Sequence, residues 1–292
     1  MPQAVDSILE QSFKDFELLI IDDGSTDNTS SIVEPYLEDK RVKYFSKANS
    51  GLGDTLNYGI SKAGGEYLIR MDSDDICHYQ RFEKLVEYMD DHPGVSACGS
   101  SVGYFKSDTI KENIYLRSFP RQHADIVAGL LKLSHVLCHP SLILRHERVL
   151  EAGKYQIKGI GEDWDFFLQL SKTGEIANIP ECVYYMRMNP NSISHTKWAE
   201  CMVNYKFSIY RYLNDTGVDG LSQFKKEYSL GKWSSFLIKQ DTLSLELYRK
   251  GLDSYIDGSK FGYYKYLFLG AIISPTRVLN RINSIFKKMK QN

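Results

Sequence analysis

Several common sequence signatures are missing from this chain of 292 residues. No run of about 18 apolar residues occurs, so we expect no ordinary transmembrane helix. The five cysteines are odd in number, widely spaced and without a Cys-x-x-Cys pair, which argues against a disulfide framework or a zinc site. The first residues lack a basic region followed by an apolar run, so no secretory signal is expected. These absences favour a cytoplasmic protein with reduced thiols.

Two nucleotide-binding signatures are absent as well, a Walker A sequence and a Gly-x-Gly-x-x-Gly at a strand–helix junction. Residues 99–103 match Gly-x-Ser-x-Gly, the sequence that surrounds the nucleophile of many hydrolases. They lie inside a predicted strand and not at a strand-to-helix turn, so they do not support a hydrolase. The formal net charge of −1 argues against a uniformly basic nucleic-acid binder, so we expect no nucleic acid among its partners.

The near-neutral net charge is the sum of two parts of the chain with opposite net charges. Residues 1–197 carry 21 basic and 29 acidic side chains, a net charge of −8. Residues 198–292 carry 15 and 8, a net charge of +7, and are mostly helical in pattern and rich in tyrosine. We therefore predict a catalytic domain over residues 1–197 and a helical C-terminal extension over residues 198–292.

The first 105 residues alternate between short apolar runs and amphipathic helical patterns. Strands are expected at residues 16–21, 42–45, 66–71 and 95–105, with a helix between each pair. This alternation predicts a doubly wound α/β fold, a mostly parallel sheet with helices on both faces. In such sheets ligands bind beyond the carboxyl ends of the strands.

Two of these predicted strands end in acidic clusters. Asp22 and Asp23 follow the first strand, and Asp72, Asp74 and Asp75 follow the third. Carboxylates this close repel one another unless a cation or hydrogen-bond donors compensate. Oxygen-rich sites suit Mg²⁺ or Mn²⁺, which bridge one or two carboxylates to substrate phosphates. The alternative for both clusters is a solvated turn with helix-capping aspartates.

A third acidic pair and one histidine are further candidates. Glu162 and Asp163 follow Gly161 at the start of a predicted helix. They could include a carboxylate general base, or could be simple N-terminal helix charge, which the helix dipole favours. His139 precedes a predicted strand, where it could serve a site or pack as a structural residue.

Five short segments occur in a specific order along the chain. They are Ser7-Ile8-Leu9-x-Gln11-Ser12-Phe13-x-x-Phe16-Glu17-Leu18, Asp22-Asp23-Gly24-Ser25-x-Asp27, Asn49-x-Gly51, Met71-Asp72-Ser73-Asp74-Asp75 and Gly161-Glu162-Asp163. This ordered set resembles the family 2 glycosyltransferases, inverting enzymes with the GT-A fold and nucleotide-sugar donors. The resemblance covers roughly residues 4–197.

The resemblance implies a donor site and a metal site. Asp23, with Asp22 beside it, would contact the base of the donor nucleotide. Asp74 and Asp75 would hold the ribose and a divalent metal, Mn²⁺ or Mg²⁺, on the diphosphate. Asp72 would complete the Asp-x-Asp pattern and contribute to binding of the nucleotide sugar.

The resemblance also implies catalytic roles and a substrate class. Asp163 would be the general base that deprotonates the acceptor hydroxyl, with Glu162 next to it, and His139 would lie near the diphosphate. The acceptor would be a saccharide or a lipid-linked saccharide in the assembly of a bacterial surface polysaccharide such as a capsule, O-antigen or exopolysaccharide.

The chain departs from the family pattern at its first strand. Family members begin with an apolar strand, central to the sheet, before the helix that here starts near Gln3. We therefore expect a vacated position in the sheet, with unpaired strand edges beside it. This departure leaves open a catalytically impaired member that acts as a binding protein. Another metal-dependent nucleotide or phosphate enzyme is the remaining alternative.

The C-terminal segment has an unusual composition. Residues 259–292 contain seven basic and no acidic side chains, between many aromatic and aliphatic ones, and Pro275 divides the segment. This composition is typical of a pair of amphipathic helices at an anionic membrane surface. We therefore expect peripheral contact with the inner face of the cell membrane. The alternative is a helix packed on the catalytic domain with a solvated basic face.

Overall fold

The computed structural model describes residues 1–106, 110, 114–189, 197–224, 243, 247 and 250–273. The chain forms two compact units. The first unit contains Met1–Tyr104, Leu116–Met188 and Asn204–Gly220, and the second contains Phe105–Tyr115, Asn189–Val203 and Leu221–Asn292. The domain boundary that we predicted after residue 197 stays a prediction.

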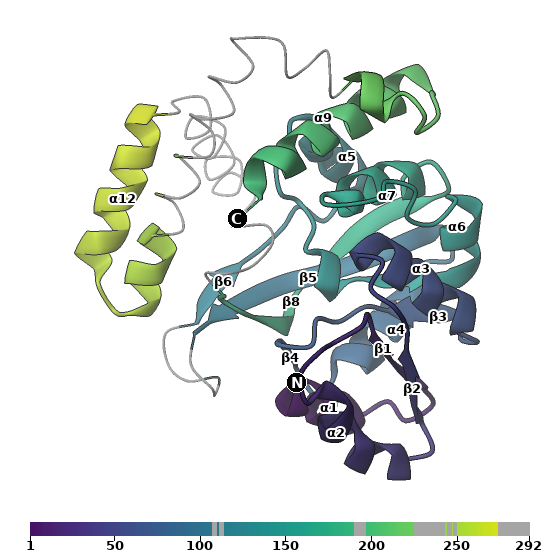
Figure 1. Cartoon of the computed structure of the whole chain (residues 1–292). Coiled ribbons are helices and arrows are strands. Elements are labelled where there is room, and N and C mark those ends of the chain that lie inside the picture. Colours follow the sequence, from purple (N-terminus) through teal and green to yellow (C-terminus); the bar gives the residue numbers. More distant parts are fainter. Residues whose placement is uncertain are drawn as a thin grey trace. The chain divides into compact units, whose positions relative to one another are not determined.

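Helices and strands alternate through the first half of the chain (Figure 1). In chain order the elements are α1 (Pro2–Leu9), β1 (Leu18–Asp22), α2 (Thr29–Val33), the 3₁₀ helix η1 (Glu34–Glu38), β2 (Val42–Ser46), α3 (Leu52–Lys62), β3 (Tyr67–Ile69), β4 (Ile76–Cys77), α4 (Arg81–Asp91), β5 (Val95–Phe105), β6 (Tyr115–Arg117), α5 (His123–Leu131), the 3₁₀ helix η2 (His139–Ser141), β7 (Ile143–Arg145), α6 (His146–Glu151), α7 (Glu162–Leu170), β8 (Glu175–Arg187), α9 (Trp198–Asn214) and α12 (Lys260–Ile273). The predicted α/β class is confirmed.

The main sheet has six strands in the order β3-β7-β5-β8-β4, with β6 paired to β5. Strand β7 runs antiparallel to both β3 and β5, and β4 runs antiparallel to β8. The sheet is therefore mixed, and our prediction of a mostly parallel sheet is wrong. Strands β3 and β5 do run parallel to each other, since each opposes β7. Strand β7 comes from beyond the alternating part of the sequence and enters between them in the opposite direction.

Strands β1 and β2 form a separate, parallel pair, with Leu18 opposite Val42 and Asp22 opposite Ser46. Among the strands that the structure describes, none pairs with the second edge of β1 or with the outer edge of β3. The apolar residues 18–21 of β1 are only half-buried. The vacated sheet position expected from the family pattern stays a prediction.

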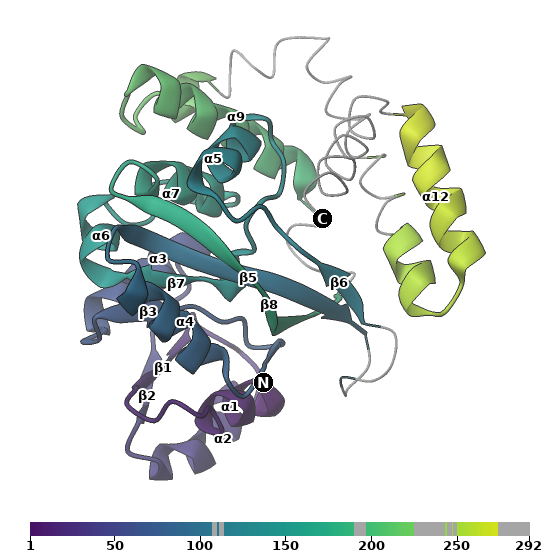
Figure 2. The ribbon, with the colours of Figure 1, turned by 180° about the vertical axis from the view of Figure 1, so that it is seen from behind.

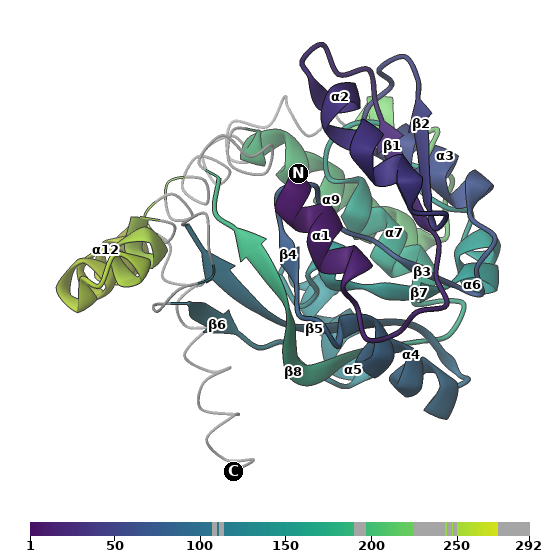
Figure 3. The same cartoon turned by 90° about the horizontal axis from the view of Figure 1, so that it is seen from below.

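Helices cover the sheet of the first unit on both faces. Leu85 and Met89 lie one turn apart on α4, are fully buried and pack with Cys98 of β5 and Ile143 of β7. Figure 3 shows α1 and α4 over this face, and Figure 2 shows α5 and α7 on the other side of β5. Because α7 follows directly on Gly161, its packing fixes the position of the Glu162–Asp163 pair.

An ion pair buried in the first unit joins α7 to α9. The Arg211 guanidinium donates to Asp165 Oδ2 at 2.5 Å and to Gln156 Oε1 at 2.7 Å. Asp165 has no exposed surface, and Arg211 is 7% exposed. The neighbouring Trp164 ring stacks on Tyr205, with centroids 4.3 Å apart. The helix that begins with the predicted catalytic pair is therefore held by both ionic and aromatic contacts.

In the second unit, residues 250–256 are helical and precede α12. Tyr115 and Tyr263 both contact the Tyr255 ring, with centroids 5.6 Å and 5.3 Å from it. Lys106 pairs with Asp253 and Asp257, each at 3.1 Å. Within the residues that the structure describes, no helix has the length and apolar character to cross a bilayer. The predicted helix after Pro275 lies outside those residues.

Candidate active site

Asp22 and Asp23, at the end of β1, each accept hydrogen bonds that fix neighbouring segments. Asp22 accepts hydrogen bonds from the Tyr44 hydroxyl at 2.7 Å and the Ser25 amide at 2.8 Å. These donors, Tyr44 first, hold the pKa of Asp22 below its ordinary value. Asp22 is buried, so its carboxylate fixes the end of β1 against β2.

Asp23 organises the segment that leads into α3. Its carboxylate accepts the amide N–H of Ser50 at 2.9 Å and of Gly51 at 3.0 Å, and it pairs with Lys47. Gly51 has a φ of +90°, a conformation that favours glycine at the point where α3 begins. Lys47 was not identified from the sequence, because nothing in the sequence indicates which carboxylate a lysine in a loop will contact.

The three aspartates after β3 have different surroundings. Asp72 accepts two hydrogen bonds from the Arg70 guanidinium, that from Nη1 to Oδ2 at 3.0 Å. Asp74 is exposed. Asp75 is 2% exposed and accepts the Tyr184 hydroxyl at 2.5 Å. Asp75 also accepts the backbone N–H of residue 187 at 2.7 Å, and burial raises its pKa to about 7.

Asp75 is therefore enclosed by β8 and fixes the acidic turn, while Asp74 faces solvent. Tyr184, the partner of Asp75, also contacts the side chain of Arg81. The Arg81 guanidinium carbon is 4.6 Å from the Tyr184 ring centroid. Arg81 is fully buried and donates to the carbonyls of Arg70 and Pro140 at 2.9 Å and 2.7 Å. This cation ties the acidic turn to the segment that carries His139.

Glu162 and Asp163 open α7 in a largely buried setting. Gly161 before them has a φ of +80°, and Asp163 Oδ1 accepts the Trp164 amide at 2.9 Å. Burial raises the pKa of Glu162 to about 7 and that of Asp163 to about 6. The close approach of the two carboxylates adds to the rise at Glu162. The start of this helix therefore holds carboxyls that can exchange a proton near neutral pH.

Arg70 lies between the acidic turn and the start of α7. It pairs with Asp72, and its positive charge opposes the burial effect on the pKa of both Glu162 and Asp163. Its side chain is 11% exposed. The structure thus brings Asp72, Glu162 and Asp163 around one largely buried cation. Arg70 was not identified from the sequence, although its place two residues before Asp72 puts both side chains on one side of an extended segment.

His139 is buried and bonded to Tyr155. Its Nε2 lies 2.6 Å from the Tyr155 hydroxyl, and its ring meets Phe167 edge-on with centroids 5.5 Å apart. Burial and then the charge of Arg70 hold the pKa of His139 well below its ordinary value, so the imidazole is neutral. His139 belongs to the surroundings of Arg70, and Tyr155 is a further residue that sequence reasoning missed.

The first turn of α3 links the Asp23 loop to α7. Asp23 holds the Gly51 amide, and a Cβ placed on Gly53 would lie 3.7 Å from the Glu162 Cβ. A larger residue at position 53 would also approach the Ile157 carbonyl at 3.3 Å. The small residue lets α3 approach the start of α7 closely, which connects the Asp23 loop with the Glu162–Asp163 pair.

The acidic turn could supply only one or two carboxylates to a metal ion. Among the described residues, no group of three or more His, Cys, Asp or Glu side chains could hold a metal ion. Mg²⁺ and Mn²⁺ are commonly held by one or two carboxylates together with phosphate oxygens and water. The exposed Asp74 and the neighbouring Asp72 meet that smaller requirement.

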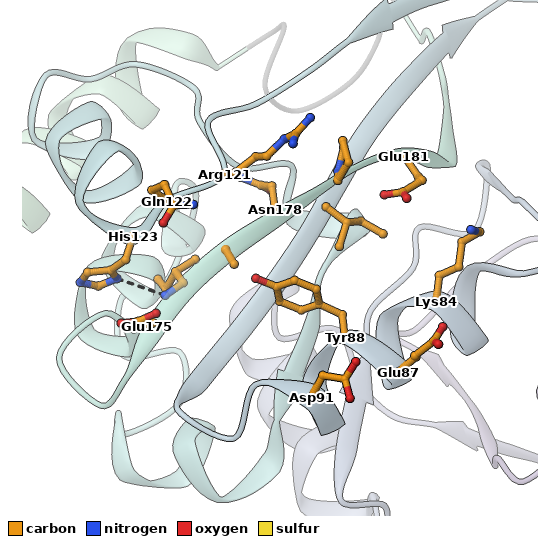
Figure 4. Close-up of a pocket in the computed structure, with 14 residues that line it drawn as sticks. Lys84, Glu87, Tyr88, Asp91, Arg121, Gln122, His123, Glu175, Asn178 and Glu181 are labelled. Atoms are coloured by element: carbon orange, nitrogen blue, oxygen red, sulfur yellow. Dashed lines mark hydrogen bonds between the residues drawn. The ribbon is translucent and has the colours of Figure 1, made fainter. Parts of the chain in front are cut away.

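A cavity of about 420 Å³ lies away from these carboxylates. It is bordered by the end of α4, residues 121–123 and the first half of β8 (Figure 4). Its rim mixes Lys84 and Arg121 with Glu87, Asp91 and Glu175, and His123 accepts a backbone N–H of β8. None of the predicted site residues lines it, so its size does not make it the active site.

Comparison with known proteins gives independent evidence on the class of protein. Residues 1–152, more than half of the chain, match the family model described as glycosyl transferase family 2. The amylovoran biosynthesis glycosyltransferase AmsE of Erwinia amylovora is 28% identical over 197 residues, which cover 66% of this chain and 73% of AmsE.

Two solved structures share the fold. S. aureus TarS 1-349 in complex with UDP-GlcNAc has a TM-score of 0.58 at 19% identity, covering 91% of this chain and 86% of TarS 1-349. The mannosyltransferase PcManGT from Pyrobaculum calidifontis, in complex with GDP-Man and Mn²⁺, has a TM-score of 0.54 at 15% identity, covering 94% and 83%. They support a GT-A-like fold. Because the family model matches more than half of this chain, the chain belongs to glycosyl transferase family 2 and is a glycosyltransferase.

Proposed function

We propose that the enzyme transfers a sugar from a nucleoside diphosphate to an acceptor hydroxyl with inversion at the anomeric carbon. The observation that carries this proposal is the arrangement around Arg70, where the acidic turn meets a carboxyl pair of raised pKa. A single displacement requires a base whose pKa is near 7 and a separate region that binds the phosphates. No covalent intermediate is needed, since one base is sufficient.

Asp163 is the proposed general base, with Glu162 beside it. The acceptor oxygen attacks the anomeric carbon from the side opposite the diphosphate, the bond from that carbon to the phosphate oxygen breaks, and Asp163 takes the hydroxyl proton. The raised pKa of Asp163 makes it a stronger base than an exposed aspartate, yet leaves it mostly ionised above pH 7. Arg70 favours the ionised form of the pair.

The other sequence-predicted residues are assigned to the donor. Asp22 holds the end of β1 and Asp23 holds the loop before α3, and the nucleotide base would bind beside them. Asp72 and Asp74 would contact the nucleotide sugar and its diphosphate, and His139 would lie near the diphosphate as a neutral group. The complexes of TarS with UDP-GlcNAc and of PcManGT with GDP-Man support a nucleotide-sugar donor without fixing its base.

Asp74 is the preferred ligand for a divalent cation. When bound, Mn²⁺ or Mg²⁺ neutralises the charge that develops on the leaving diphosphate. Asp75, also predicted as a metal ligand, would have to release the Tyr184 hydroxyl and the backbone N–H of residue 187 to reach it. We therefore propose that Asp75 acts by holding the turn. The Mn²⁺ in the PcManGT complex supports the choice of metal.

The Asp74→Asn variant is expected to bind UDP or GDP about tenfold or more weakly than wild type when Mn²⁺ is present, because one metal ligand loses its charge. With EDTA the two proteins should bind equally. Isothermal titration with each nucleotide measures this, with Asp125→Asn as a matched exposed control on α5. Equal Mn²⁺-dependent affinities in wild type and Asp74→Asn would remove Asp74 from the metal site.

The Arg70→Met variant should shift the acid limb of the kcat–pH profile upward by about one pH unit. Loss of the cation raises the pKa of Glu162 and Asp163 further, so the ionised base disappears at a higher pH as the solution is acidified. Arg70→Lys keeps the charge and should leave the limb in place. A limb that stays unchanged in Arg70→Met would show that this arginine does not act on the base.

The acceptor is proposed to be a saccharide, free or lipid-linked, in surface polysaccharide assembly. The name of the AmsE relative supports this class, at 28% identity. A panel of UDP- and GDP-sugars with Mn²⁺ and lipid-linked acceptors tests the whole proposal. The product linkage, read by NMR, should be opposite in anomeric configuration to the donor. A retained configuration would overturn the single-displacement mechanism.

A further inference from the structure

Helix α12 of the second unit is apolar around most of its circumference. Lys260 and Lys265 are its only charged residues, and it has no acidic residue. A helix of this kind needs an apolar environment on every side, either a protein core or lipid. With 14 residues it is about 21 Å long, too short to span a bilayer.

One side of α12 is covered by its own unit. Tyr263 and Tyr266 lie against the helix at residues 250–256, where a Cβ placed on Gly251 would be 3.3–3.4 Å from them. The Tyr263 ring also contacts Tyr255, and Gly270 is buried. Figure 1 shows the short helix beside α12. The residues of this side of α12 are therefore shielded from water by the helix at residues 250–256.

The opposite side, here called the outward face, consists of Phe261, Tyr264, Phe268 and Ile272. These residues are spaced by three or four positions and so lie along one stripe of the helix. They are 81%, 66%, 67% and 62% exposed, respectively. Four large apolar side chains in one stripe at this exposure form a continuous patch, unlike the single exposed apolar residues of most surfaces.

The charges around the stripe indicate what covers it. Lys260 and Lys265 are both exposed, and Lys265 follows Tyr264 directly at the edge of the stripe. The sequence beyond α12 adds five basic residues and no acidic one. Aromatic and aliphatic side chains bordered by lysines match the boundary of an anionic bilayer, where rings enter the headgroup region and lysines meet lipid phosphates. A second copy of the same basic surface would instead repel it.

We propose that the outward face of α12 binds the surface of an anionic lipid bilayer, with the helix lying parallel to the membrane plane. The proposal identifies an interaction surface and is independent of the transfer reaction. The lipid supplies apolar cover for the four side chains, and the lysines supply attraction that weakens with salt. Such a surface would keep the enzyme at the membrane, where lipid-linked substrates are found.

Flotation of the full-length protein with vesicles tests this surface. Wild type should float with vesicles of equal parts phosphatidylglycerol and phosphatidylcholine, and much less with phosphatidylcholine alone or at high salt. Phe261→Ser with Phe268→Ser should lower the partition into the anionic vesicles about tenfold or more. The matched control changes Leu116 and Leu213 to Ser, two apolar residues 62% and 65% exposed elsewhere in the chain.

Three results of the flotation experiment would overturn the proposal. They are failure of wild type to float, equal flotation of wild type and the phenylalanine double variant, and equal loss in the leucine control. Circular dichroism should show that both double variants keep the wild-type fold, as expected for exposed positions. Sedimentation without lipid should show the same mass for wild type and Phe261→Ser/Phe268→Ser. A wild-type dimer dissociated by these changes would make the outward face a contact between copies.

Phe268→Trp provides a second measurement that does not depend on loss of binding. Wild type has three tryptophans, so the fluorescence that the variant adds to the wild-type spectrum is followed. This added fluorescence should shift to the blue on addition of anionic vesicles and be quenched by brominated lipid. Leu213→Trp should show neither change. A Phe268→Trp spectrum that is insensitive to vesicles would contradict insertion of this face, even if the protein floats through another segment.

Discussion

Replacing Asp163 by Asn is expected to lower kcat by about 10²–10⁴-fold, the usual contribution of a general base, with little change in nucleotide affinity. The amide cannot take the acceptor proton but keeps the size of the side chain and its acceptor oxygen for the Trp164 amide. Release of nucleoside diphosphate at saturating donor and acceptor measures kcat, and titration with UDP or GDP measures binding.

Glu162→Gln is the matched comparison for this result. Both carboxyls are near the start of α7, and burial raises the pKa of each. If Asp163 is the base, Glu162→Gln should cost less in kcat and leave the acid limb of the pH profile near its wild-type position, because Glu162, with the higher pKa, is largely uncharged where Asp163 ionises. Full activity of Asp163→Asn, or a larger loss in Glu162→Gln, would move the base role to Glu162.

The Arg211→Met variant is expected to lose about 3–5 kcal/mol of unfolding free energy. It leaves the Asp165 carboxylate fully buried with neither its ionic partner nor the link through Arg211 to Gln156. Since Asp165 lies one turn inside α7, the start of the helix should loosen as well. Urea denaturation at neutral pH gives the free energy, and the midpoint should fall without a change of slope.

An exposed ion pair of the same unit provides the control for this loss. Lys172 pairs with Asp215 at 2.7 Å, but the Asp215 side chain is 92% exposed. Lys172→Met should therefore cost less than about 1 kcal/mol. The double change Asp165→Leu with Arg211→Met should recover part of the stability, because no buried charge is left unpaired. Equal losses of unfolding free energy in Arg211→Met and Lys172→Met would mean that the buried pair stabilises the fold no more than the exposed pair.

The sequence predicted the strands and acidic turns of the first 105 residues because they depend on local order. Apolar runs become β1, β2, β3 and β5, and polar turns follow β1 and β3. It could not predict that β7 enters between β3 and β5, since the pattern of a strand does not indicate which strands it pairs with. The mixed sheet is therefore a consequence of contacts between distant segments.

The same limit applies within the candidate site. Asp72, Asp74 and Asp75 are nearly identical in sequence terms, yet one pairs with Arg70, one is exposed and one is buried. The Tyr184 hydroxyl that holds Asp75 comes from 109 positions away. Arg70 was within reach of sequence reasoning through the alternation of an extended segment, whereas Tyr184 and Tyr155 were not.

The sequence by itself determined the family and the kinds of groups at the site. Motifs a few residues long specify carboxylates at the ends of strands and at the start of a helix, because turns and helix starts depend on neighbouring residues. Only the tertiary structure decided which carboxylates are free and which are held, and where the buried cation lies. Burial and hydrogen bonding depend on distant side chains, and these set both the availability of an oxygen atom and the pKa of a carboxyl.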